Sequence, residues 1–239
     1  MERIVTEYAR MLDRLYVSTN HYPEQSLALH TAARGHQYGD LMIVGRAVNG
    51  WDVNIDNQNS SKKGDLLQVV DATLRDKNWM GNLKWVTNRW GVNDGEYNTK
   101  KSAFWRVVNE LSDNFSDKND NGLYFDSIVW SNLYKVAPED GGNPSSKLRN
   151  VIFEYCLNIL REEIVFFKPK YVVFLTGYEY WADRFIIGLG AESIEIPEKR
   201  FVKYAGIYNN VRIIVAQHPM RKPEESHVNE INEMCEFIK

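Results

Sequence analysis

Four apolar runs, each followed by a glycine or a polar residue, most constrain what this chain can fold into. They read LMIV, SIVWS, KYVVFL and VRIIVA, at residues 41–44, 127–131, 170–175 and 211–216. Runs that are apolar on both faces and alternate with helical patterns are typical of a mostly parallel sheet covered by helices on two sides. We therefore predict an α/β fold, a three-layer α/β/α sandwich around a central, mostly parallel sheet of four strands.

Helical periodicity fills the intervals between these runs. Apolar residues three and four positions apart predict helices near residues 4–15, 66–74, 104–111, 148–167, 180–187 and 224–238. A minor strand is predicted at residues 201–204. Residues 46 to about 101 are polar and uneven, and we interpret them as a long insertion in one domain spanning residues 1–239.

Charge and cysteine content limit the function classes. With 29 Lys and Arg against 32 Asp and Glu, the net charge of −3 excludes an overall basic field, so any contact with nucleic acid must be local. The two cysteines, Cys156 and Cys235, are too few for a four-cysteine zinc or iron–sulfur site. Both lie in helix-like apolar patterns typical of small buried hydrophobes, and we expect no metal and no cofactor.

The opening stretch MERIVTEYARMLDRLY carries charges throughout and lacks the apolar core of a signal peptide. No apolar run approaches the roughly 18 residues that a membrane span requires. We predict a cytoplasmic protein without membrane contact, and we assume a monomer.

In a parallel sheet, ligands bind beyond the carboxyl ends of the strands, where residues from distant parts of the chain meet. Here those ends carry Gly45, Asn132, Gly177 and His218. An asparagine amide both donates and accepts hydrogen bonds and can read a nucleobase edge, whereas a histidine can donate to an oxygen that gains negative charge. Structural roles stay open for both, because Asn132 can tie the following loop and His218 can be a satisfied structural residue.

The segment QHPMRK follows the last apolar run. Pro219 biases His218 toward an extended backbone. Met220, followed by Arg221 and Lys222, forms an apolar tip beside two cations. Such a tip suits a wedge that enters a base stack while the cations meet phosphates, and a solvated turn before the last helix is the alternative.

The segment VGRAVNGWD, residues 44–52, is a glycine-bearing turn after the first run, so its backbone can approach a ligand closely. It is neither a dinucleotide-binding nor a phosphate-loop motif. We expect Gly45, Arg46 and Ala47 to line a substrate. Asn49 and Asp52 are candidates for holding a water molecule, although a structural turn explains them equally well.

The order strand-GRAVNG, strand-SNLYKVAP, helix-FKPKYVVFLTG and strand-QHPM resembles the uracil-DNA glycosylase superfamily over roughly residues 40–223. The resemblance implies hydrolysis of the N-glycosidic bond of a flipped uracil or other damaged base, in single-stranded or damaged duplex DNA. It implies that Asn132 reads the base and that His218 stabilises the departing anion, with Met220 in place of the motif's serine. Lys135 and Pro138 look like the lysine and proline that follow this asparagine in some branches.

The first motif has Ala47 and Val48 where the family places Asp, Ala or Asn and then Pro. This leaves Asn49 or Asp52 to position the water. Arg46 favours phosphate binding over water activation, so a diverged, non-hydrolysing nucleic-acid or nucleotide-binding protein is a second reading. An unrelated α/β small-molecule enzyme is a third.

Overall fold

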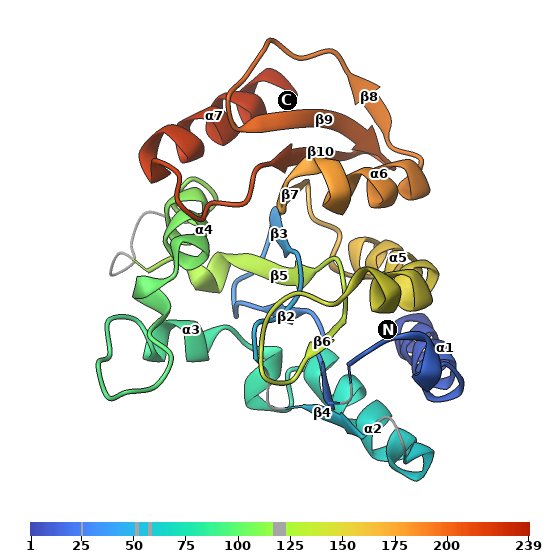
Figure 1. The fold of residues 1–239 in the computed structure, drawn as a ribbon. Coiled ribbons are helices and arrows are strands. Elements are labelled where there is room, and N and C mark those ends of the chain that lie inside the picture. The colour runs from blue at the N-terminus through green and yellow to red at the C-terminus, as the bar shows by residue number, and fades with distance from the viewer. Residues whose placement is uncertain (25, 51–52, 57–58, 117–122) are drawn as a thin grey trace. The chain divides into compact units, whose positions relative to one another are not determined.

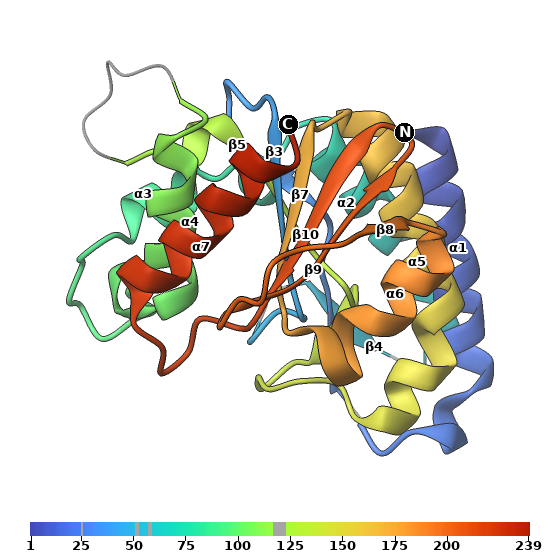
Figure 2. The same ribbon diagram turned by 90° about the horizontal axis from the view of Figure 1, so that it is seen from above.

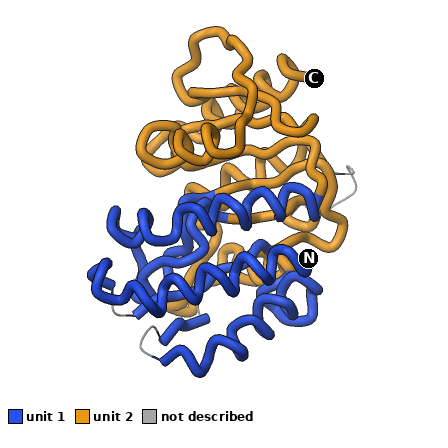
Figure 3. The backbone as a smooth tube through the Cα atoms, turned by 90° about the vertical axis from the view of Figure 1, so that its right-hand side faces the viewer, with its two compact units in different colours: residues 1–32, 45–81, 132–167 blue, residues 33–44, 82–131, 168–239 orange. Residues whose placement is uncertain are grey.

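The computed structural model describes residues 1–24, 26–50, 53–56, 59–116 and 123–239. The chain is a mixed α/β structure with two compact units whose segments alternate along the sequence (Figure 3). Unit 1 comprises residues 1–32, 45–81 and 132–167, and unit 2 comprises residues 33–44, 82–131 and 168–239. That residues 1–239 form one domain stays a prediction.

The main sheet belongs to unit 2, apart from the last residues of two of its strands, Gly45 and Asn132, which group with unit 1. Its strand order is β2-β5-β3-β7-β10-β9-β8 (Figure 1). The strands are β2 (Ala33–Arg34), β3 (Leu41–Gly45), β5 (Ile128–Asn132), β7 (Tyr171–Leu175), β8 (Glu192–Ile194), β9 (Val202–Tyr208) and β10 (Val211–Ala216).

The strand directions make this a mixed sheet. Both β3 and β10 run parallel to β7, whereas β9 is antiparallel to β10, β8 to β9, and β2 to β5. The four predicted strands are the neighbours β5, β3, β7 and β10, and every residue of β3, β5 and β7 is buried, as two-sided apolar runs require. The sheet has seven strands, so the count of four was wrong: β2, β8 and β9 extend it on both sides.

The helices of unit 2 are α3 (Lys84–Asn88), α4 (Ala103–Asp113), α6 (Asp183–Leu189) and α7 (Glu224–Phe237). Figure 2 shows α4 and α7 side by side. They are joined by an ion pair in which Arg106 Nη2 lies 2.5 Å from Glu224 Oε1. Edge-to-face contacts of Trp105 with Trp85, Trp130 and Phe125, at centroid separations of 5.0 to 5.7 Å, build an aromatic core beneath α4.

Unit 1 contains an antiparallel sheet in the order β4-β1-β6, formed by β4 (Asn54–Asp56), β1 (Ser26–Leu29) and β6 (Val136–Pro138). Its helices are α1 (Glu2–Val17), α2 (Lys63–Leu74) and α5 (Ser146–Phe167). Figure 1 shows α1 beside α5, where Cys156 Sγ lies 3.8 Å from Met11 Sδ. The start of α5 is capped by Ser145 Oγ, which accepts from the amide of Leu148 at 3.1 Å.

The insertion at residues 46–101 is more structured than the sequence indicated. Besides the predicted helix, which is α2, its described part contains β4 and α3. None of the described helices combines the length and apolar character that a membrane span requires.

Candidate functional site

The segments that follow β7 and β10 lie together, where the carboxyl ends of these two parallel strands of the unit 2 sheet meet. Leu175 pairs with Ala216 at the ends of these parallel strands. Two residues after Leu175, the amide of Gly177 donates to the carbonyl of the same Ala216 at 2.8 Å. For these two strands the predicted meeting of carboxyl ends is confirmed.

His218 follows β10 and is half-buried. Its ring is stacked with that of Phe104 at an interplanar angle of 28°, with centroids 6.5 Å apart. Its Nδ1 accepts a hydrogen bond from the backbone amide of Met220 at 3.2 Å. A neutral imidazole that accepts through Nδ1 carries its proton on Nε2, so His218 has the tautomer that donates through Nε2.

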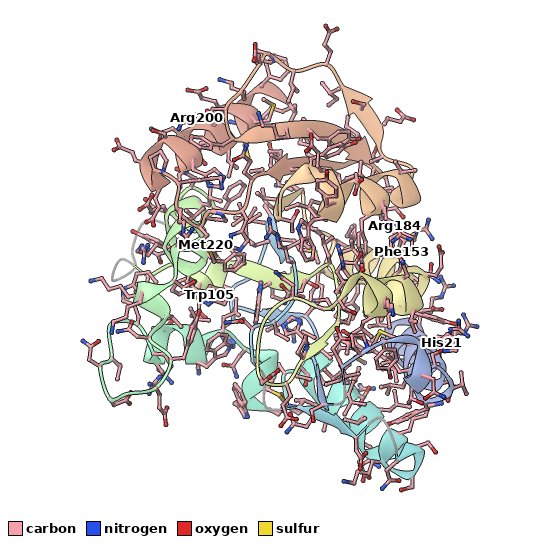
Figure 4. All side chains as sticks on the ribbon, viewed as in Figure 1. His21, Trp105, Phe153, Arg184, Arg200 and Met220 are labelled. Atoms are coloured by element: carbon pink, nitrogen blue, oxygen red, sulfur yellow. The ribbon has the colours of Figure 1, made fainter. Side chains whose placement is uncertain are left out.

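Residues 219–222 form a hydrogen-bonded β-turn, since the amide of Lys222 donates to the carbonyl of Pro219 at 3.1 Å. Arg221, the third residue of the turn, has φ of 61°, as in a type II turn, where glycine is favoured. Met220, labelled in Figure 4, is 60% exposed, and Arg221 beside it in the sequence is exposed as well. The predicted apolar tip with adjacent cations is therefore present.

Asn132, the predicted base-reading residue, lies in the interior of unit 1. It is only 2% exposed, and its Nδ2 is 3.2 Å from Nδ1 of His30. The backbone of His30 is held by two further hydrogen bonds, from Tyr8 Oη to its carbonyl and from its amide to the carbonyl of Lys135, both at 2.8 Å. Sequence reasoning missed His30, because the two partners lie 102 positions apart in the sequence and no local pattern links them.

Lys135 and Glu163 form an ion pair whose side chains are fully buried, with Nζ and Oε2 2.7 Å apart. Lys135 Nζ also donates to the backbone carbonyl of Asn132 at 2.8 Å. Burial, and then the charge of Lys135, hold the pKa of His30 well below its usual range. We call His30, Asn132, Lys135 and Glu163 the buried polar network. It fixes both the backbone and the side chain of Asn132.

The turn after β3 is tied to the chain that follows β5. The carbonyls of Gly45 and Arg46 accept from the amides of Leu133 and Tyr134 at 2.8 and 3.0 Å. Gly45 is buried, Arg46 and Ala47 are half-buried, and burial lowers the pKa of Arg46 from its ordinary value.

Asn49 and Asp52 are the two candidates for holding a water molecule. Asn49 Oδ1 accepts from the amide of Gly142 at 2.7 Å, so its side chain ties two loops of unit 1 and the structural reading is favoured. Asp52 lies outside the described residues.

The chemistry of the cysteines is limited by burial. Burial raises the pKa of the thiols of Cys156 and Cys235 to about 12, so both are poor nucleophiles near neutral pH. Their prediction as buried hydrophobes is confirmed. Across the described ranges, no group of three or more His, Cys, Asp or Glu side chains could hold a metal ion.

The predicted site residues thus fall into two sets. Gly45, Arg46, Ala47, Asn49 and Asn132 belong to unit 1, whereas His218, Met220, Arg221 and Lys222 belong to unit 2. Their convergence on one ligand stays a prediction. No protein-family model matches the chain, and no curated protein matches its sequence significantly.

Proposed function

We propose that the chain is a base-excision protein of the uracil-DNA glycosylase kind, with the α/β/α sandwich fold of that superfamily. In this role it hydrolyses the N-glycosidic bond of a uracil or other damaged base turned out of the stack. The observation that carries the proposal is the hydrogen bond from the Met220 amide to His218 Nδ1, which in the neutral ring places the proton on Nε2.

The base leaves as an anion when its bond to the sugar breaks. A preorganised donor stabilises the oxygen on which this charge develops, and loss of one such donor lowers the rate about 100- to 1,000-fold. Turning the base out of the stack costs a few kcal/mol. In this role the exposed Met220 fills the vacated space, and the cations of the exposed Arg221 and the half-buried Lys222 meet phosphates.

A second candidate, binding of a base or nucleotide without hydrolysis, is favoured by two observations in unit 1. The Asn49 side chain is hydrogen-bonded to the Gly142 amide, and the Ala47 side chain has no polar group to hold a water. Asn132, the residue expected to read the base, is buried in the buried polar network. It therefore has a structural role as well.

The two candidates are separated by incubating the protein with single-stranded and duplex oligonucleotides that contain uracil, followed by alkaline cleavage at abasic sites. We expect cleavage by the wild type and a loss of about 100- to 1,000-fold in His218→Ala. The matched control is His36→Ala, an exposed histidine of unit 2, which should keep full activity. Melting temperatures of both variants should stay within a few degrees of the wild type.

Absence of cleavage on every substrate, together with salt-sensitive nucleic-acid binding, would replace hydrolysis by the second candidate. Absence of binding as well would favour the small-molecule enzyme. If His218→Ala loses stability but keeps its activity per folded molecule, His218 is structural and the mechanism is wrong.

A further inference from the structure

The carboxylate of Glu230, on helix α7, binds three consecutive backbone amides. Its Oε2 accepts from the amides of Phe201 and Val202 at 2.6 and 3.2 Å, and its Oε1 accepts from the amide of Arg200 at 3.2 Å. Hydrogen bonds to a charged acceptor are roughly twice as strong as those between neutral groups. These bonds therefore tie the start of β9 to α7.

The same segment holds the residue that precedes His218. The backbone amide of Gln217 donates to the carbonyl of Phe201 at 2.9 Å, and its side-chain Nε2 donates to the carbonyl of Arg200 at 3.2 Å. Gln217 lies one residue beyond β10, so these bonds continue the attachment to the β9 segment past the end of the strand. They connect Glu230 to His218 through two sets of hydrogen bonds and one peptide bond.

A second side chain of α7 packs against this segment. His227 precedes Glu230 by three positions, so the two lie on one face of the helix. The His227 ring is buried and meets that of Phe201 edge to face, at an interplanar angle of 86° with centroids 5.2 Å apart. Helix α7 therefore holds residues 200–202 by packing as well as by charge.

The ring of His218 has two supports of its own. Phe104 stacks against it, and the amide of Met220 donates to its Nδ1. Both contacts require the backbone at Gln217 to stay in place, because the imidazole moves with the chain that carries it. A carboxylate on α7 can thus set the direction of the His218 Nε2–H without touching the ring.

We propose that Glu230 is a positioning residue for His218, acting through residues 200–202 and Gln217. The expected effect on catalysis rests on the proposed function, whereas the orientation of His218 can be measured without a substrate. A displacement of about 1 Å at a reacting group can lower a rate about 100-fold. Loss of the carboxylate should therefore lower kcat and leave KM nearly unchanged, because the role assigned to Glu230 involves no contact with the substrate.

The orientation of His218 is tested by NMR of the full chain with isotope-labelled histidine, at about pH 8, where an ordinary histidine is neutral. The spectrum of His218→Ala identifies the signals of this ring. We expect the wild type to show the Nε2–H tautomer alone. Glu230→Ala should show a measurable fraction of the Nδ1–H tautomer, because the ring no longer receives the Met220 amide.

Catalysis is tested by oligonucleotide cleavage, with rates taken per folded molecule. We expect kcat to fall about 10- to 100-fold in Glu230→Ala, with KM within about twofold of the wild type. Glu230→Gln keeps an oxygen that can accept from the amides, and it should lie between Glu230→Ala and the wild type. The matched control is Glu233→Gln on the same helix. The Glu233 carboxylate pairs with Lys199 at 2.5 Å, and its loss should leave both measurements unchanged.

A single Nε2–H tautomer in both Glu230 variants would overturn the inference and leave the proposed function intact if the wild type cleaves. Changed tautomers with an unchanged kcat, or an equal loss in Glu233→Gln, would also overturn it. A wild type that cleaves no substrate contradicts the proposed function alone, and a tautomer mixture in the variants then still supports the fixing of His218 by Glu230. If Glu230→Ala does not fold, the same comparisons are made with Glu230→Gln.

Discussion

The buried polar network of unit 1 and the exposed loops of unit 2 both contain polar residues, but in opposite surroundings. Lys135 and Glu163 are 0% exposed and form an ion pair, whereas Tyr180 and Met220 are 81% and 60% exposed. A buried charge that loses its partner stays buried, so such a network tolerates little change. Exposed loop residues can be replaced at small cost in folding, and this freedom is what a recognition surface needs.

The largest effect should come from removing one member of the buried ion pair. Glu163→Leu leaves the Lys135 charge uncompensated in the interior, and we expect the free energy of unfolding to fall by about 3–5 kcal/mol, measured by urea titration. The double variant Lys135→Met with Glu163→Leu removes both charges and should recover most of this loss.

The matched control is the exposed pair Asp71 and Arg75 on α2, joined at 2.7 Å. Asp71→Ala should change the free energy of unfolding by no more than about 0.5 kcal/mol. A loss in Glu163→Leu no greater than this would contradict the contrast between buried and exposed charges.

Acid should weaken the protein through its buried histidines. Burial lowers the pKa of both His30 and His227 below 6.5 in the folded state. The unfolded chain therefore binds protons first as the pH falls below about 6.5, and the free energy of unfolding drops by at most about 1.4 kcal/mol per pH unit for each histidine. Above about pH 6.5 this contribution to stability is fully present.

Urea titrations between about pH 7.5 and about pH 5.5 measure this slope. His30→Gln should reduce it, whereas His21→Gln, at an exposed position, should leave it unchanged. Equal slopes in all three proteins would remove His30 as a cause of the slope.

The smallest effect concerns the strained turn. Arg221→Gly relieves a left-handed conformation, and we expect a gain of about 0.5–1 kcal/mol in the free energy of unfolding together with weaker nucleic-acid binding. Lys168→Gly, at φ of 51° after α5, should give a similar gain without affecting binding. Unchanged binding in Arg221→Gly would show that this arginine meets no phosphate.

The sequence was sufficient for the elements with strong local signals. The run VRIIVA became β10 at its predicted residues, and helix α5 ends at Phe167, just before Pro169. Strands β4 and β8, with sequences NID and ESI, have no apolar run. They form because β1 and β9 provide backbone groups with which they can pair. Such short polar strands depend on tertiary partners and leave no periodic pattern.

Some residues of the candidate site could be predicted and others could not, because local features leave a pattern in the sequence and long-range contacts do not. The tip at Met220 is local in sequence, and it was found. The partners of Asn132 and Lys135 lie 102 and 28 residues away, so neither His30 nor Glu163 could be assigned to them from one sequence. Tyr180 was predicted to begin a helix, but Glu179 and Tyr180 have non-helical backbone angles.

The separation of Lys135 from Glu163 also has a consequence during synthesis. At about 5–20 residues per second, the 28 residues from position 136 to Glu163 take roughly 1–6 s to be added. During this interval the nascent chain contains the lysine without its carboxylate, and unit 1 lacks most of α5. The interior of unit 1 can become fully packed only after α5 has been synthesised. Until then the face of α1 that packs against α5 is uncovered, and the nascent chain must avoid aggregation through it.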